Sequence, residues 1–260
     1  MQSAVNQTYK NLQILVIDGA HDPDNEKFVK KINKRDQRVH YIYANDPIKK
    51  SGMYGDVQEA RNVGVKLASG KYVAMLDDDD EWSTSKIAHQ VYYAETYNAA
   101  LVSCQTIIKG RGHIDKPGVL PDYKTLLKSF NISCMSSFFI NREKLKEIGG
   151  FKNSRTMHEY DIALKLAKNK EKIIVIPLPL MVKDPFNETK RKYYLTSIRA
   201  IFDMYNNYGL ECIKQLGARG FIFNLTKSSL LVALNILGML IKEKSWIIIY
   251  KLKNMYQEKI

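Results

Sequence analysis

Short apolar segments alternate with amphipathic segments over the first third of the chain. Runs rich in branched apolar residues at 12–18, 39–44 and 71–77 are typical of buried strands. Helical spacing of apolar positions predicts helices over 24–34, 56–68 and 83–97. This regular alternation of strand and helix predicts an α/β fold with a mostly parallel sheet flanked by helices.

The middle of the chain continues this pattern less regularly. Three further strands and two helices are expected, around a loop that contains Gly and Pro: strands 101–108, 134–140 and 172–180, helices 141–151 and 158–170, and the loop 109–122. From about residue 187 the pattern is helical only. We therefore expect one α/β domain over residues 1–186 and a helical, amphipathic appendage over residues 187–260.

Acidic residues are crowded at the end of the strand expected over 71–77. The stretch YVAMLDDDDEW places five acids, Asp77 to Glu81, directly after an apolar run. Like charges this close must be solvated or paired with a cation, so the run is either a solvated loop or a site for a divalent metal. Asp18 also ends an apolar run, and ligands of parallel sheets bind at the carboxyl ends of strands.

The overall charge points to an anionic partner. The chain has 260 residues, 40 Lys and Arg against 27 Asp and Glu, and a net charge of +13. Candidate partners are nucleic acid, an anionic membrane surface and a phosphorylated substrate. The basic residues are scattered and form no nucleic-acid motif, so we expect no nucleic acid.

The cysteines and the hydropathy bear on location. Cys104, Cys134 and Cys212 have neither zinc-site spacing nor the even number of a disulfide framework, which fits a reducing cytoplasm. The sequence contains no uninterrupted run of 18 apolar residues, so no membrane span is predicted.

Four segments occur in an order that resembles family 2 glycosyltransferases with the GT-A (Rossmann-like) fold. They are NQTYKNLQILVID, EARNVGVKLASGKYVAMLDDDDEW, GGF and HEYDIALKLA, and the resemblance covers roughly residues 4–182. It implies transfer of a sugar from a nucleotide-diphosphate sugar, UDP-sugar above all, to an acceptor hydroxyl with inversion. The diphosphate leaving group gains negative charge in this reaction, and a divalent cation stabilises that charge.

The resemblance also implies roles for individual residues. Asp77 and Asp79 form the Asp-x-Asp motif of the family, with Asp78 between them. Asp79 would be the main ligand of Mg²⁺ or Mn²⁺, which both prefer carboxylate oxygens and water. Asp77 would help hold the metal or contact the nucleotide. Asp18 resembles the acid that binds the nucleobase, and Arg61 resembles an Arg close to the nucleotide.

Glu159 is the expected catalytic base. An inverting transferase needs a carboxylate that removes the proton of the acceptor hydroxyl. In His158-Glu159-Tyr160-Asp161, Glu159 stands where the family has an Asp. Its side chain is one methylene longer, and such chemistry depends on close positioning.

The chain departs from the family pattern in three places. The opening strand of the family is not found before residue 12, which would leave sheet edges unpaired. Residues 45–56 replace a shorter loop, and residues 181–190 contain no His to assist the metal. The missing strand and the altered stretch His158-Glu159-Tyr160-Asp161 favour an alternative, a non-catalytic glycosyltransferase-like domain that acts as a binding partner.

The C-terminal stretch 228–260 has apolar runs flanked by lysines, a pattern typical of a helix lying in a membrane interface. Packing on the catalytic domain or on a second subunit is the alternative, so a homo-oligomer or a partner subunit stays open. We expect a cytoplasmic enzyme, peripheral at the inner face of the cell membrane. It would act on a glycan or lipid-linked acceptor in surface polysaccharide synthesis.

Overall fold

The computed structural model describes most of the chain, in two compact units that we treat separately. The described residues are 1–19, 22–44, 55–109, 113–115, 120–128, 132–152, 158–184 and 190–240. The first unit contains Met1–Asp122 and Ile132–Asp184, and the second contains Tyr123–Asn131 and Pro185–Ile260. Most of the predicted 45–56 loop and residues 241–260 of the predicted membrane segment lie outside the described residues.

A two-stranded parallel sheet begins the first unit. β1 (Ile14–Asp18) pairs with β2 (Val39–Tyr43), and α2 (Pro23–Asn33) connects them. Parallel neighbours need such a crossover, and the alternation in the sequence predicts it. α3 (Gly55–Leu67) packs closely on β1 at Gly64. A Cβ atom added to this glycine would lie only 3.4 Å from the Ile17 side chain.

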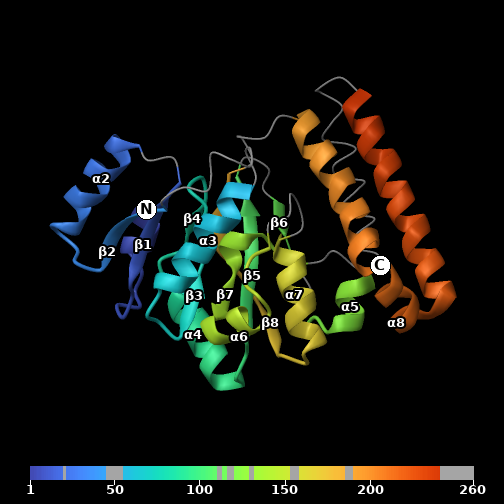
Figure 1. Ribbon diagram of the computed structural model, residues 1–260, viewed down its shortest axis with the longest axis horizontal. Helices are drawn as coiled ribbons and strands as arrows, with labels where there is room; N and C mark the ends of the chain where they lie inside the picture. Colours follow the sequence, from blue (N-terminus) through green and yellow to red (C-terminus); the bar gives the residue numbers. More distant parts are fainter. Residues whose placement is uncertain are drawn as a thin grey trace. The chain divides into compact units, whose positions relative to one another are not determined.

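A second sheet forms the centre of the first unit, with the order β3-β7-β5-β8-β4 and β6 paired to β5 (Figure 1). Its strands are β3 (Tyr72–Ala74), β4 (Glu81–Trp82), β5 (Leu101–Ile108), β6 (His113–Asp115), β7 (Phe139–Asn141) and β8 (Ile173–Lys183). Only the β5–β8 pair is parallel in this sheet. The α/β class with flanking helices is as expected, but the strand pairing is mixed rather than mostly parallel.

The last strand runs further than the sequence predicts. Prolines at 177 and 179 indicated an end near residue 180, yet β8 continues to Lys183. The pairing of β5 with β8 shifts register on either side of Gln105, where residues 177–179 are exposed. A bulge of this kind accommodates residues that cannot donate to the ladder. The extension carries β8 alongside β4.

Four helices and a 3-10 turn complete the first unit. They are α1 (Gln2–Val5), α4 (Lys86–Tyr97), α6 (Arg142–Glu147), α7 (His158–Lys168) and the 3-10 helix η2 (Met135–Ser137). Asn141 caps α6 by accepting hydrogen bonds from the backbone N–H groups of Glu143 and Lys144. A core cluster lies between α4 and the sheet and includes Ile87, Val102, Cys104, Phe139 and Ile176.

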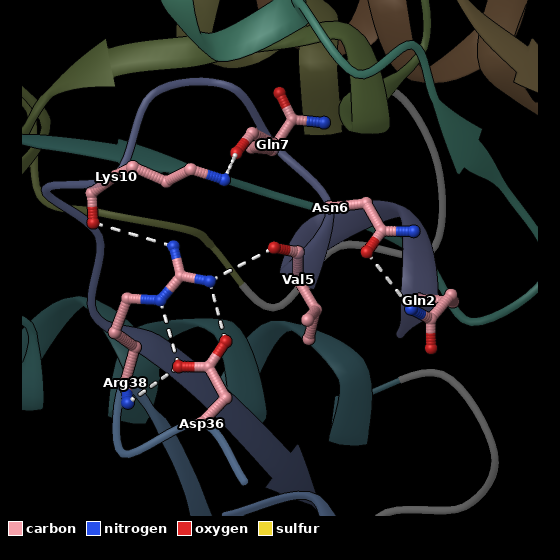
Figure 2. Close-up of polar contacts among 7 residues, drawn as sticks. All are labelled: Gln2, Val5, Asn6, Gln7, Lys10, Asp36 and Arg38. Carbon is pink, nitrogen blue, oxygen red and sulfur yellow. Dashed lines mark hydrogen bonds and ion pairs between the residues drawn. The ribbon is translucent and has the colours of Figure 1, made fainter.

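The N-terminal segment is fastened by polar contacts rather than by strand pairing. The Arg38 guanidinium forms an ion pair with Asp36 at 2.6 Å and donates to the carbonyls of Val5 and Lys10 (Figure 2). The fully buried Gln7 side chain donates to the Ser83 carbonyl and accepts from the Ile87 N–H. The segment therefore joins the β1–β2 sheet to the start of α4.

The two sheets are not joined to each other through described residues. β1 pairs with β2 alone and β3 pairs with β7 alone, so each has one edge without a strand partner in the part of the chain that the structure describes. The sequence predicts such unpaired edges, because the opening strand of the family is not found before residue 12.

The second unit is helical. It contains α5 (Tyr123–Lys128) and α8 (Lys190–Leu240), which Gly217, with φ of 69°, divides into two arms. The arms are drawn side by side in Figure 1, and the hydroxyls of Tyr205 and Ser228 join them at 2.9 Å. Among the described residues, no helix has the length and apolar content needed to cross a membrane.

A lysine lies completely buried beside the core. Lys86 at the start of α4 is 0% exposed, and its ammonium group donates to the Gln90 side chain at 2.6 Å. It also lies 4.3 Å from the centre of the Trp82 ring. Burial lowers the pKa of Lys86 to about 8, and the thiols of Cys104 and Cys134 only weakly oppose this.

The lowered pKa predicts how stability depends on pH. In the unfolded chain a lysine has a pKa of about 10.4, so between pH ~8 and pH ~10.4 the unfolded state binds a proton that the folded state lacks. The free energy of unfolding should therefore rise through this window, by up to about 3 kcal/mol, and be independent of this group below it. In Lys86→Met this rise should disappear, as measured by urea unfolding at a series of pH values. The exposed control Lys66→Met should keep it, and an unchanged slope in Lys86→Met would contradict the assignment.

Candidate functional site

The acidic run forms a tight turn between β3 and β4. The Asp80 N–H donates to the Asp77 carbonyl at 3.2 Å, and the side chains of Asp78 and Asp79 at the tip are exposed. At the base of the turn, the Asp77 N–H donates to the Ser136 hydroxyl at 3.0 Å. The turn is therefore fixed at its ends and presents two carboxylates to solvent.

Asp77 and Arg61, both predicted from the sequence, are brought together. The Arg61 guanidinium, on α3, lies 2.6 Å from an Asp77 carboxylate oxygen, with side-chain exposures of 13% and 34%. The guanidinium also lies 5.9 Å from the centre of the ring of Phe151, the last residue of the GGF stretch. The cation partly neutralises the first acid of the turn, so Asp78 and Asp79 remain the more available carboxylates.

Asp80 is the buried acid of the turn. It is 4% exposed, and both carboxylate oxygens are buried without a hydrogen-bond partner in the described part of the chain. Burial raises the pKa of Asp80. The Ser136 hydroxyl, whose contact with this carboxylate is too weak to count among the direct hydrogen bonds, and the charge of Lys183 oppose the shift only in part. A buried carboxylate that accepts no hydrogen bond is costly, which fits a cation at this place.

Glu159 lies at the first turn of α7 and is held by η2. Its Oε1 atom accepts a hydrogen bond from the Met135 N–H at 3.1 Å. The neighbouring His158 is close to the same charges. Burial lowers the pKa of His158, the charge of Glu159 opposes this shift, and the charge of Arg61 adds to it. The predicted base, Arg61 and the acidic turn therefore belong to one electrostatic cluster.

Two residues of η2 connect the parts of this cluster. Met135 donates to Glu159, and the Ser136 hydroxyl accepts from the Asp77 N–H. The Ser136 carbonyl accepts from the Trp82 indole N–H at 2.7 Å. Met135 and Ser136 were not predicted as site residues, because the stretch CMSSFFI is typical of a strand. The only signal was the pair of serines that interrupts the apolar run.

Asp18 has a different setting. It is 7% exposed at the end of β1, where it accepts from the Tyr41 hydroxyl at 3.0 Å and from the Asp22 N–H at 3.2 Å. Burial, followed by the hydrogen bond to Asp18, raises the pKa of Tyr41 to about 12. The described contacts of Asp18 are thus with β2 and the start of α2, and its place at a nucleobase stays a prediction.

The residues present fit a metal that is only partly coordinated by protein. No group of three or more His, Cys, Asp and Glu residues suitable for a metal occurs among the described residues. The exposed carboxylate of Asp79 at the tip, next in sequence to the buried Asp80, nevertheless provides hard oxygen atoms. Mg²⁺ is often held by one or two carboxylates, with substrate phosphates and water as the other ligands.

Comparison with known sequences identifies the family of the chain. The model for "Glycosyl transferase family 2" matches residues 1–149. The chain is 32% identical over 154 residues to the UDP-Glc:alpha-D-GlcNAc-diphosphoundecaprenol beta-1,3-glucosyltransferase WfaP of Escherichia coli, covering 57% of this chain and 56% of WfaP. It is 25% identical over 173 residues to the putative teichuronic acid biosynthesis glycosyltransferase TuaG of Bacillus subtilis, covering 65% of each. The chain thus spans about half the length of WfaP.

Solved structures agree on the fold. The mannosyltransferase PcManGT from Pyrobaculum calidifontis, in complex with GDP-Man and Mn²⁺, has a TM-score of 0.57 at 15% identity, covering 98% of this chain and 81% of that one. S. aureus TarS in complex with UDP-GlcNAc has a TM-score of 0.55 at 15% identity, covering 79% and 61%. Both likenesses show the fold alone, and they confirm the GT-A architecture expected from the sequence. Together with the family match over more than half of its residues, this establishes that the chain belongs to glycosyl transferase family 2.

Proposed function

We propose that residues 1–186 transfer a sugar from a UDP-sugar to a hydroxyl of a lipid-linked glycan acceptor, with inversion and with help from Mg²⁺ or Mn²⁺. The observation that carries this proposal is the attachment of both the acidic turn and Glu159 to η2. Relatives support the substrate class, because WfaP is named for a UDP-linked donor and a diphosphoundecaprenol acceptor. TuaG is named for the synthesis of a cell-surface polymer.

The donor would be held at the acidic turn. Asp79, with Asp77, would hold the metal, which supplies positive charge to the diphosphate as it leaves. Asp77, Asp78 and Arg61 would contact the nucleotide, and Asp18 would lie at the nucleobase. The Arg61–Asp77 ion pair gives both side chains a fixed position before the donor binds.

Glu159 would serve as the base. The acceptor oxygen forms a bond to the anomeric carbon while the bond from that carbon to the diphosphate oxygen breaks, and UDP departs with the bonding electrons. The acceptor proton passes to Glu159. One of its oxygen atoms is held by the Met135 N–H, so the other is available for this proton.

The helical unit supports a proposal about location. Large apolar side chains are exposed on both arms of α8, namely Phe202, Leu210, Ile213, Ile222, Phe223, Leu225 and Leu230. Such exposure is unusual for a surface in water, and basic residues such as Lys214 and Arg219 lie among them. We propose that this apolar surface of α8 lies on an anionic membrane at the cytoplasmic face, near a lipid-linked acceptor.

The alternative function is a non-catalytic domain that binds a partner protein. The unpaired edges of β1 and β3 favour it. The two functions differ in whether a nucleotide binds and whether sugar is transferred, which the following experiments measure.

Asp79→Ala should abolish the dependence of donor binding on metal. Calorimetry of UDP-glucose binding with Mn²⁺ should show at least a tenfold loss of affinity relative to the wild type, because the main protein ligand of the metal is removed. Asp24→Ala, an exposed acid on α2, is the matched control and should bind as the wild type does. Absence of nucleotide binding by the wild type would favour the non-catalytic alternative.

Glu159→Gln should keep donor binding and lose transfer. The amide preserves the hydrogen bond from Met135 but takes no proton, so kcat should fall by about a hundredfold or more. Transfer of radiolabelled sugar to an undecaprenyl-diphosphate-linked acceptor measures this, with Glu95→Gln on α4 as the control. Equal rates in Glu159→Gln and the wild type would remove Glu159 from the mechanism.

Charges placed on the apolar surface of α8 should weaken membrane binding. Co-sedimentation with vesicles of phosphatidylglycerol should fall severalfold in Leu210→Asp combined with Ile222→Asp. Leu178→Asp, an exposed apolar residue of β8, should have no effect. Co-sedimentation that is unchanged in the double variant would refute attachment through these arms.

A further inference from the structure

A lysine lies opposite the buried acid of the turn. β4 and β8 pair in antiparallel register, with Glu81 opposite Val182 and Trp82 opposite Met181. Continuing this register by one residue beyond β4 would place Lys183 opposite Asp80. Opposed residues of an antiparallel pair have neighbouring Cβ atoms and side chains on the same face. The register therefore directs the Lys183 side chain toward the buried side of the acidic turn.

Lys183 is also surrounded by the acids of the proposed site. Burial alone would lower the pKa of Lys183, but the Cys134 thiol and the carboxylates of Asp80, Glu159 and Asp77 raise it above its usual value. Its backbone is fixed on the β5 side, because the Lys109 N–H donates to its carbonyl and its pairing with Ile108 closes the β5–β8 ladder. The ammonium group is thus a fixed cation among acids contributed by the turn and α7.

The charges at this place do not balance without a further group. Asp77 is paired with Arg61, whereas the two Asp80 oxygens accept no hydrogen bond in the described part of the chain. The Ser136 hydroxyl and the charge of Lys183 both favour the charged form of Asp80, and neither outweighs the effect of burial on its pKa. A diphosphate approaching this turn meets several carboxylates, so it needs cations on the protein as well as a metal. An ammonium group with three donors is a common partner of phosphate oxygens.

We propose that Lys183 is a donor-binding residue, whose ammonium group contacts a diphosphate oxygen of the nucleotide sugar beside the metal that Asp79 would hold. This rests on the proposed function and adds to it a protein cation that remains at the diphosphate when the metal is absent. Lys183 is carried to this position by the part of β8 that continues beyond its two prolines.

The test compares UDP with UMP, because only UDP has the second phosphate. Calorimetry on the full chain, with Mn²⁺ and again with EDTA, should show that Lys183→Met lowers the affinity for UDP about tenfold or more. The affinity for UMP should change less than about twofold, and the loss for UDP should persist in EDTA. Lys183→Arg, which keeps the charge, should retain most of the affinity for UDP.

Lys172→Met is the matched control, since it makes the same change at an exposed position just before the other end of β8. It should leave both affinities unchanged. Thermal unfolding verifies that each variant folds, and Lys183→Gln replaces Lys183→Met if the latter does not fold.

The outcomes separate this inference from the proposed function. If the wild type binds UDP and Asp79→Ala weakens that binding, while Lys183→Met leaves the ratio of UDP to UMP affinity unchanged, Lys183 is only a counter-ion of Asp80 and the inference is wrong. A loss of UDP and UMP affinity by the same factor would also overturn it. If the wild type binds neither nucleotide, the proposed function fails, and with it the inference.

Discussion

The candidate site depends on the short 3-10 helix η2, which binds the acidic turn and Glu159 at once. Two N–H···O contacts, from Asp77 to the Ser136 hydroxyl and from Met135 to Glu159, lie on adjacent residues. A third, from the Trp82 indole to the Ser136 carbonyl, fixes the other side of the turn. Because these donors and acceptors lie on consecutive residues, a shift of η2 would move the proposed metal-binding turn and the proposed base together.

Charge is the second constraint on this region. Burial of Asp80 is unfavourable unless a cation is near, and Arg61 is already engaged by Asp77. The contacts of the buried Lys86 are the Trp82 indole ring and the Gln90 amide rather than a carboxylate. Gln90 in turn donates to the carbonyls of Val102 and Ser137, so the network reaches the last residue of η2. The polar contacts behind the turn thus join the turn to the sheet.

Local rules predicted much of the fold, and long-range pairing accounts for what they missed. Asn141 and the glycines at 149 and 150 marked the limits of α6 correctly, because capping and positive φ are properties of neighbouring residues. The continuation of β8 past Pro177 was missed, since only the pairing with β5 and β4 shows that a bulge absorbs the prolines. For the same reason the sequence identified Asp77, Arg61 and Glu159 as candidates, but not Ser136 or Lys183. Ser136 contacts Asp77 and Lys183 lies near Asp80 and Glu159, and in each case the residues are far apart in the sequence.

The contact of Glu159 with η2 bears on its departure from the family pattern. The resemblance places an Asp at this position, and a Glu there extends the carboxylate by one methylene, which would misplace a base that was not otherwise held. Here the Met135 N–H binds Oε1 and limits the rotation of the longer side chain. The same hydrogen bond leaves one oxygen of the carboxylate for the acceptor proton. A longer side chain with a fixed end can position a base as a shorter one does, so the substitution is compatible with catalysis.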